Sequence, residues 1–254
     1  MILDSIEKSI KEKVQALGTP LSEWDIKINY GIKTGLNEAF IISGRKRREI
    51  LEKEPKSDEI IRPILRGKDI KRNKINFTDL FLINTHNGIP SMGIKRVDIN
   101  EYPAIKNHLD TFWGQINRRF DQGDTPYNLR SCAYMEEFTK QKIVFPAIMT
   151  QGPFFSLDES GAMILAPGNL ITGKNLIGLV SFLTSPVCYY ALRSYYMGGG
   201  IEGELKVNRL QILPIPIRID NRKYSFDEVA LEFQLNSKEI DNIMESPYIN
   251  RGFF

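Results

Sequence analysis

The chain has 254 residues, of which 42% are hydrophobic and 26% are charged, and its formal net charge is +3. This length and composition are typical of one large globular domain, or of a domain with helical additions. The two cysteines, Cys132 and Cys188, form no disulfide or metal-binding pattern, and neither a signal peptide nor a membrane span can be found. We therefore expect a cytoplasmic protein with reduced thiols and no membrane partner.

The N-terminal segment predicts an amphipathic helix. Apolar residues recur at helical spacing from Ile2 to Leu17, and Gly18-Thr-Pro20 ends the pattern. The other end of the chain predicts a helical tail with a second apolar stripe over residues 226–244, interrupted near Asn236-Ser237. Residues 220–254 carry seven acidic and four basic side chains, so this tail is not expected to lie on DNA. We expect the terminal helices to pack against each other, the body or another domain.

The middle of the chain alternates between strand-like and helical segments. A helix is predicted from Tyr102-Pro103 through Ile116, with a first-turn proline and with arginines near its end. Further helices are predicted over 176–183 and from Ser185-Pro186 to before Gly198. Short β-rich runs, bounded by turn residues, predict strands at 80–84, 142–147, 154–157, 162–165 and 209–213. The order is irregular and lacks regular βαβ alternation, so the fold class is α+β with helices at both ends.

A concentration of positive charge lies between Arg62 and Lys74. This segment holds six basic residues against the single acid Asp69, a local balance of +5 in a chain whose total is only +3. Such a concentration is typical of a surface that docks a polyanion. Composition alone leaves open that it is an ordinary solvated basic face.

The sequence contains few signs of catalytic chemistry. It has no glycine-rich nucleotide loop and no serine nucleophile elbow, and its two histidines, His86 and His108, are not spaced as metal ligands. Metal-dependent nuclease chemistry needs clustered carboxylates with a lysine, and the chain offers such pairs at Glu137/Lys140 and Glu204/Lys206. Chance pairs of this kind are common in a highly charged chain. We therefore expect no catalytic residue, no metal and no cofactor in this chain.

Several loops carry residues suited to nucleic-acid contact. The turn from Gly31 to Gly35 presents Lys33 and Thr34, although it could also be a simple hairpin turn. The turn after the strand at 80–84 presents His86 and Asn87, and asparagine suits a bidentate contact with adenine but is also a common turn residue. Arginines flank the turn-rich stretch 121–128, and glycines crowd the segment 198–203. Each loop fits either base or phosphate contact, or an ordinary connection.

Five motifs in register give these loops a common interpretation. They are Gly31-Ile-Lys-Thr-Gly-Leu-Asn-Glu-Ala-Phe40, Ile61-Arg-Pro-Ile-Leu-Arg-Gly-Lys-Asp-Ile-Lys-Arg72, Tyr102-Pro-Ala-Ile-Lys-Asn-His-Leu109, Tyr127-Asn-Leu-Arg-Ser-Cys-Ala-Tyr134 and Leu213-Pro-Ile-Pro216. Over roughly residues 24–217 the chain resembles the TaqI-like C-terminal specificity domain. That family supplies the target recognition domain of type II restriction-modification enzymes, especially those that fuse an N6-adenine DNA methyltransferase to an endonuclease.

The resemblance implies a DNA-reading module with a twisted, mostly antiparallel sheet. It also implies a division into a connector helix at 1–20, a recognition domain at 21–219 and a helical tail at 220–254. The methyltransferase motifs that bind S-adenosylmethionine and grip the flipped adenine are absent from the sequence. S-adenosylmethionine and Mg²⁺ are therefore expected only in a partner methyltransferase or endonuclease domain, in the same polypeptide or a partner chain.

These considerations assign two sets of residues to double-stranded DNA. The candidates for phosphate contact are Lys33, Arg66, Lys68, Lys71, Arg72, Lys206 and Arg209. The candidates for reading base edges are Thr34, His86, Asn87, Arg118, Arg130 and Gln151. Two alternatives stay open: a metal-dependent nuclease domain, and a module whose basic segment docks an acidic protein surface.

Overall fold

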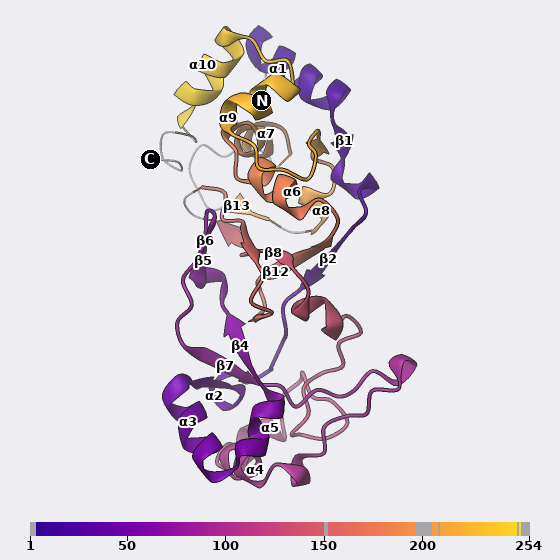
Figure 1. The fold of residues 1–254 in the computed structure, drawn as a ribbon, viewed down its shortest axis with the longest axis vertical. Coiled ribbons are helices and arrows are strands. Elements are labelled where there is room, and N and C mark those ends of the chain that lie inside the picture. The colour runs from indigo at the N-terminus through magenta and orange to yellow at the C-terminus, as the bar shows by residue number, and fades with distance from the viewer. Residues whose placement is uncertain (1–3, 150–151, 197–204, 208, 248, 250–254) are drawn as a thin grey trace.

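The computed structural model describes residues 4–149, 152–196, 205–207, 209–247 and 249. Figure 1 shows an elongated molecule with helices at both ends and a sheet between them. Two clusters of buried apolar side chains fill these ends. We call them the terminal core, which includes residues from both chain ends, and the loop core, which lies among residues 32–170.

The terminal core is covered by helices. These are α1 (Ser5–Leu17), α6 (Leu176–Leu183), α7 (Pro186–Ala191), α9 (Phe226–Glu232) and α10 (Ser237–Glu245). Of the partners expected for the terminal helices, the structure shows that they pack against each other and against the body. Glu239 of α10 accepts hydrogen bonds from the hydroxyl of Ser9 and from Nζ of Lys13 on α1, each at 2.7 Å. Asn236 caps α10 at the interruption seen in the apolar stripe.

A four-stranded antiparallel sheet joins the two cores. Its strands follow the order β10 (Ser156–Asp158), β8 (Lys142–Phe145), β12 (Asn169–Gly173) and β2 (Ile26–Tyr30). Successive side chains of a strand point to opposite faces. Accordingly Ile143 and Phe145 lie in the terminal core, whereas Val144 between them lies in the loop core, and all three are fully buried. The sheet therefore has apolar contacts on both faces.

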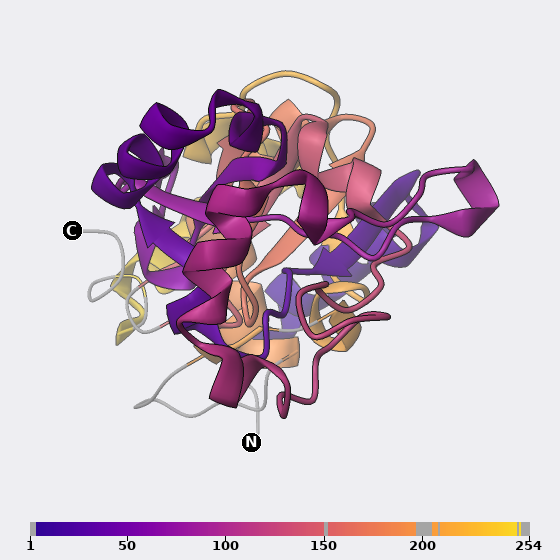
Figure 2. The same cartoon turned by 90° about the horizontal axis from the view of Figure 1, so that it is seen from below.

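The loop core is built on a second four-stranded sheet. Its order is β11 (Met163–Ile164), β4 (Ile61–Leu65), β7 (Leu80–Ile83) and β3 (Ile41–Ser43), with β11 parallel to β4 and the other pairs antiparallel. The helices around it are α2 (Asn37–Phe40), α3 (Gly44–Lys53), α4 (Pro103–Asp110) and α5 (Trp113–Ile116). Pro103 occupies the first turn of α4, as expected. In Figure 2 the loop that includes the turn Pro90–Met92 projects from the body beside this core.

Short elements complete the chain. Two-stranded ladders join β1 (Thr19–Pro20) to β14 (Pro216–Ile217), β13 (Leu205–Lys206) to β9 (Ile148–Met149), and β5 (Ile70–Lys71) to β6 (Lys74–Ile75). Tight 3₁₀ turns occur at Leu21–Glu23, Pro55–Ile60, Gly67–Asp69, Pro90–Met92, Ile99–Glu101 and Met135–Thr139, and a wider π-helical turn, Leu192–Tyr196, follows α7. The elements together form the mixed α+β fold with mostly antiparallel sheets that the sequence predicts.

The strand predicted over 209–213 is wrong. Arg209–Ile212 forms the single-turn helix α8, and the amide of Leu213 bonds the carbonyl of Arg209 at 3.2 Å. Arg209 is exposed and Ile212 is fully buried, which matches strand alternation, but a run of four residues is too short for periodicity to distinguish a helix from a strand. The turn directs the chain toward the ladder between β14 and β1, where the carbonyl of Ile215 accepts a hydrogen bond from the amide of Leu21.

In the part of the chain that the structure describes, no single helix is long and apolar enough to cross a membrane. Helix α6 and the stretch Pro186–Tyr196 pass a length and composition test only as a pair, and they are bent by 60° relative to each other. Most of their residues are buried in the terminal core. Such burial is common for the core helices of globular proteins.

Candidate nucleic-acid interface

Three loops that are far apart in the sequence meet beside the loop core. They are the segments 31–36, 84–97 and 118–131, and we call them together the loop cluster. Hydrogen bonds among the three segments hold them in place. Each segment contains residues that the sequence pattern assigns to DNA, so the structure brings together residues that were proposed separately.

Arg119 joins two of the three segments of the loop cluster. Its side chain is buried, with 7% of its surface exposed. The guanidinium donates to the main-chain carbonyl of Thr34 at 2.6 Å, to that of Pro126 at 3.1 Å, and to those of Asp121 and Asn128. A planar group with five N–H donors is suited to serving several acceptors at fixed angles. One side chain thus fixes two of the three loops relative to each other.

The surroundings of Arg119 lower the pKa of its guanidinium and bring it next to an aromatic ring. Burial lowers the pKa of the Arg119 guanidinium from 12.5 to about 10, although the nearby Asp121 opposes that shift. The guanidinium lies 4.5 Å from the centre of the Phe40 ring, a geometry suited to a cation–π contact. From the sequence Arg119 stands out only as a neighbour of Arg118, because spacing gives no sign of which of two adjacent arginines points inward.

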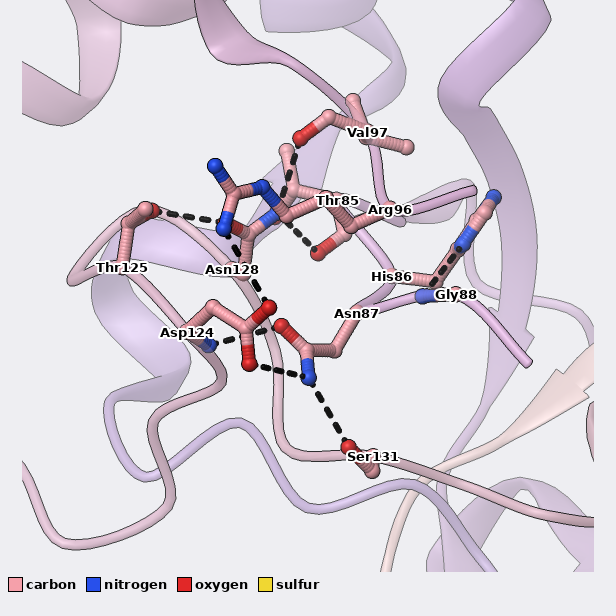
Figure 3. A network of polar contacts seen from close by, with 10 residues as sticks. All are labelled: Thr85, His86, Asn87, Gly88, Arg96, Val97, Asp124, Thr125, Asn128 and Ser131. Atoms are coloured by element: carbon pink, nitrogen blue, oxygen red, sulfur yellow. Dashed lines mark hydrogen bonds and ion pairs between the residues drawn. The ribbon is translucent and has the colours of Figure 1, made fainter. Parts of the chain in front are cut away.

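Asn87 links the second and third loops, as Figure 3 shows. Its amide nitrogen donates to the carboxylate of Asp124 at 3.0 Å and to the hydroxyl of Ser131 at 2.9 Å. Its amide oxygen accepts from the main-chain N–H of Asp124 at 2.7 Å. Asp124 also forms an ion pair with Arg96 at 3.2 Å. The side chain of Asn87 is therefore fully used within the protein.

Asn128 makes a second connection in the same network (Figure 3). The side chain is buried, donates to the carbonyl of Val97 at 2.9 Å, and accepts from the hydroxyl of Thr125 at 2.6 Å. The hydroxyl of Thr85 donates to the carbonyl of Tyr127 at 2.6 Å. The network joins the base of the projecting loop to the 121–128 turn, so the loop cluster is an ordered surface rather than a set of independent connections.

The surface of the loop cluster is rich in cations. Its exposed basic residues are Lys33, Lys95, Arg96, Arg118 and Arg130. Arg130 forms an ion pair with Asp121 at 3.4 Å, and about two thirds of its side chain remains exposed. Beside these residues a depression of about 470 Å³ lies between the 31–36 loop, Asp121 and the stretch 165–167.

The predicted base-reading residues divide into two groups. Thr34 is buried, and its hydroxyl donates to Asn37 and accepts from the amide of Leu36, so it does not face solvent. His86 is half-buried, and its Nδ1 accepts from the amide of Gly88 at 3.1 Å. Burial lowers the pKa of His86, and the charge of Arg62 lowers it further. Arg118 and Arg130 are exposed, whereas Gln151 lies outside the described residues.

The predicted phosphate-binding residues lie in four places. Lys33 is on the loop cluster, whereas Lys206 is exposed on β13 and Arg209 is exposed at the start of α8. The remaining four, Arg66, Lys68, Lys71 and Arg72, belong to the segment around the β5–β6 hairpin. Figure 1 shows this hairpin at the left edge of the molecule, and the projecting loop lies at the right edge. The structure therefore does not gather the predicted phosphate contacts on one surface.

Part of the basic segment is engaged in the fold. Arg66 bonds the buried carboxylate of Asp69 through Nε at 3.0 Å and through Nη2 at 2.9 Å, and it also donates to Thr78. Nζ of Lys71 lies 4.9 Å from the centre of the Phe154 ring. Burial lowers the pKa of the Arg72 guanidinium. The charge concentration is thus partly a structural feature, although Lys68, Lys71, Arg72 and Lys74 all remain exposed.

The β5–β6 hairpin is hydrogen-bonded to residues that lie near the terminal core. The amide of Asn73, at the tip of the hairpin, donates to the carbonyl of Phe155 at 2.9 Å, and its side-chain nitrogen donates to the hydroxyl of Thr184 at 3.3 Å. The hydroxyl of Ser156 donates to the carbonyl of Lys71 at 2.8 Å. The hairpin follows strand β4 of the loop core along the chain. These contacts attach it to helix α6 and to the sheet that joins the two cores, which we call the central sheet.

The pair Glu137/Lys140, considered for nuclease chemistry, belongs to a hydrogen-bond network within the fold. Glu137 is buried and accepts hydrogen bonds at 3.0 Å from Lys27 and from Lys140, and at 2.6 Å from the hydroxyl of Thr172. Burial by itself would raise the pKa of Glu137, but the three hydrogen bonds outweigh it and lower that pKa to about 2. Glu204 lies outside the described residues. Across the described ranges, no group of three or more His, Cys, Asp or Glu is arranged to hold a metal ion.

Comparisons with known proteins bear on the fold. No protein-family model matches the sequence, and no curated protein matches it. Among solved structures, the type IIG restriction endonuclease BpuSI aligns with 96% of this chain and 32% of its own, with a TM-score of 0.56 and 14% identity. The type IIL restriction-modification enzyme MmeI, solved in complex with DNA, aligns with 92% of this chain and 33% of its own, with a TM-score of 0.55 and 11% identity.

The fold of this chain resembles that of a segment of each of these two restriction-modification enzymes. The chain spans about a third of the length of the two enzymes that it matches. At these identities the likeness concerns the fold, and it supports the resemblance stated from the sequence at the level of restriction-modification enzymes rather than at the level of the TaqI-like domain.

Proposed function

We propose that this chain is a sequence-specific recognition domain for double-stranded DNA that acts within a type II restriction-modification system. Catalysis would reside in an adenine-specific methyltransferase domain, with or without an endonuclease, in the same polypeptide or in a partner chain. S-adenosylmethionine and Mg²⁺ would be bound there. The fold likeness to two restriction-modification enzymes, one of them solved with DNA, supports this class of function.

The observation that carries the proposal is the loop cluster. Five exposed cations project from loops whose main chains are held by the buried Arg119 and by the Asn87 and Asn128 networks. Binding to DNA needs positive charge for affinity and ordered side chains for reading base edges. A preorganised loop surface supplies both without a large cost of ordering on binding.

The structure changes which residues we assign to each role. Arg118 and Arg130 remain candidates for base reading, and Lys33, Lys95 and Arg96 are candidates for phosphate contact on the same surface. Thr34, His86 and Asn87 are better regarded as residues that shape the loops, because their side chains are buried or used within the protein. Lys68, Lys71 and Arg72 stay as candidates for a second contact with the backbone of longer DNA.

The proposal can be tested with two matched triple variants. One changes Lys33, Arg118 and Arg130 to Gln, and the other changes Lys68, Lys71 and Arg72 to Gln, so each removes three positive charges. Binding to a duplex selected from a random pool is measured by fluorescence anisotropy at several salt concentrations. The loop variant is expected to lose affinity and to reduce the salt slope by about 0.9 for each phosphate that it no longer neutralises.

The outcomes separate the alternatives. Absence of duplex binding by the unaltered chain would contradict the proposed function. If the loop variant binds like the unaltered chain while the hairpin variant is weakened, the interface lies at the β5–β6 hairpin instead. If an acidic protein surface competes for the chain and duplex DNA does not, the chain is a protein-binding module. We also expect S-adenosylmethionine to leave the melting temperature of this chain unchanged, because its site lies in the partner domain.

A further inference from the structure

Phe120 is the most exposed large apolar side chain among the described residues. Its relative exposure is 103%, so the ring makes no packing contact that hides it from water. It belongs to the 118–131 segment of the loop cluster and directly follows the buried Arg119. An aromatic ring that is fully exposed on an ordered loop is unusual, because such rings ordinarily gain stability from burial.

The main chain that carries Phe120 is held on both sides. The preceding residue, Arg119, is anchored through its guanidinium, and its carbonyl accepts from the side chain of Gln122 at 2.8 Å. On the other side, the carbonyl of Asp121 accepts from Arg119. The 31–36 loop packs against this position, since a Cβ added to Gly35 would lie 3.1 Å from the Cβ of Asp121. The exposed ring therefore projects from a fixed support.

The charges around Phe120 indicate the kind of ligand that the ring meets. Arg118 precedes it and is exposed, and the ion pair between Arg130 and Asp121 follows it. Lys33 lines the same depression as Asp121. An apolar ring among exposed cations suits a ligand that is anionic outside and aromatic inside, which is the structure of a nucleic acid.

We infer that Phe120 stacks on a base or inserts between two base pairs of the bound duplex. Apolar side chains inserted at a base step unstack it and bend the DNA, and the bend brings more of the backbone onto the protein. The flanking cations would receive that backbone. This inference rests on the proposed function and extends it, because it assigns to one residue a contact that reads the stacking of the bases rather than their edges.

A tryptophan at position 120 provides a direct test. The variant Phe120→Trp is titrated with the selected duplex, and the matched control is Leu231→Trp, which replaces a side chain that is 76% exposed on α9. Stacking on a base is expected to quench the added fluorescence of Phe120→Trp and to leave that of Leu231→Trp unchanged. The signal of the two native tryptophans is subtracted with the unaltered chain.

Removal of the ring provides the second measurement. Phe120→Ala is expected to bind the duplex about tenfold more weakly and to bind heparin, a polyanion without bases, as tightly as the unaltered chain does. Leu231→Ala is expected to match the unaltered chain with both ligands. The thermal stability of Phe120→Ala should be preserved, since the ring it removes is exposed to solvent.

The inference and the proposed function fail in different ways. If the unaltered chain does not bind duplex DNA, the proposed function is wrong and the inference falls with it. If the unaltered chain binds, the inference is overturned when Phe120→Trp is not quenched, when Phe120→Ala binds the duplex normally, or when Phe120→Ala weakens heparin and DNA binding equally. The proposed function stands in each of these cases. Quenching together with a weakening confined to DNA supports the inference.

Discussion

Arg119 orders a stretch of turn-forming residues by hydrogen bonding to their main-chain carbonyls. A buried guanidinium is costly unless its donors are satisfied, and here main-chain carbonyls of Thr34, Asp121, Pro126 and Asn128 accept from its two terminal nitrogens, whereas its buried Nε has no hydrogen-bond partner among the described residues. Removal of Arg119 would take away this hydrogen bond from the carbonyls of Thr34, Asp121 and Pro126, whereas the carbonyl of Asn128 still accepts from the amide of Gly123. The neighbouring Arg118 has an exposed side chain and gives the natural comparison.

Replacement of Arg119 by alanine is therefore expected to be strongly destabilising. We expect Arg119→Ala to lower the free energy of unfolding by about 3 kcal/mol or more, because it leaves a cavity and unpaired carbonyls. Arg118→Ala should change it by about 0.5 kcal/mol or less. Urea unfolding followed by circular dichroism measures both. Equal stability of the two variants would show that the bonds of Arg119 contribute little to the fold.

Glu137 predicts a specific dependence of stability on pH. Because the pKa of Glu137 falls from 4.5 in the unfolded chain to about 2 in the folded one, its contribution is present above pH 4.5 and is lost as the pH falls toward 2. We expect Glu137→Gln to cost about 2 kcal/mol at pH 7 and progressively less between pH 4.5 and pH 2. Unfolding free energies of both proteins across this range measure the difference. A difference independent of pH would contradict the assignment.

At the scale of elements, the β5–β6 hairpin connects the two cores through hydrogen bonds. Asn73 holds a left-handed main-chain conformation, with φ of 51°, at the point where the hairpin bonds Phe155 and Thr184. Asparagine and glycine adopt this conformation at low cost, whereas β-branched residues do not. The conformation at residue 73 therefore determines whether the hairpin can reach the central sheet.

Two substitutions at Asn73 separate conformation from side-chain contact. Asn73→Gly keeps the conformation and removes only the bond to Thr184, so we expect a loss of about 1 kcal/mol or less. Asn73→Val also strains the main chain and should cost about 2 kcal/mol. Thermal or urea unfolding provides the measurement. The idea fails if valine is tolerated as well as glycine.

The sequence predicts most of the elements for identifiable physical reasons. Apolar periodicity and caps determine α1 and α10 locally, and these are confirmed. The stretch Arg209–Ile212 is too short for periodicity to distinguish a helix from a strand, and tertiary packing decides it. The meeting of the three loops depends on the inward direction of Arg119, and the position of the basic hairpin depends on contacts with Phe155. Neither feature is encoded in local spacing. The sequence could therefore predict several individual residues of the site, but not which of them lie together on one surface.

At the scale of the whole molecule, the central sheet couples the two cores. Neighbouring residues of β8 belong to different cores, as Val144 and Phe145 illustrate. Neither core can lose its packing without exposing one face of the same sheet. The two ends of the molecule should therefore unfold together, although they look separate in Figure 1.

The two tryptophans allow this cooperativity to be measured. Trp24 packs against the terminal core, and Trp113 lies beside Tyr127 next to the loop core. We expect the single-tryptophan variants Trp113→Phe and Trp24→Phe to report coincident urea transitions, each matching the transition seen by circular dichroism. Two separated transitions would show that the cores fold independently.

The acceptors of Arg119 have a consequence for how such a surface could diversify. All four are main-chain carbonyls, which every amino acid provides, so the hydrogen bonds of Arg119 place no demand of their own on side-chain identity. The side chains that the loop cluster does require are those of its own networks, such as Asn128 and Asn87. Substitutions at exposed positions such as Lys33, Arg118 and Arg130 leave the anchoring intact. The chain is thus suited to retargeting: a library of variants at these positions should retain the parental architecture while its members explore different ligands.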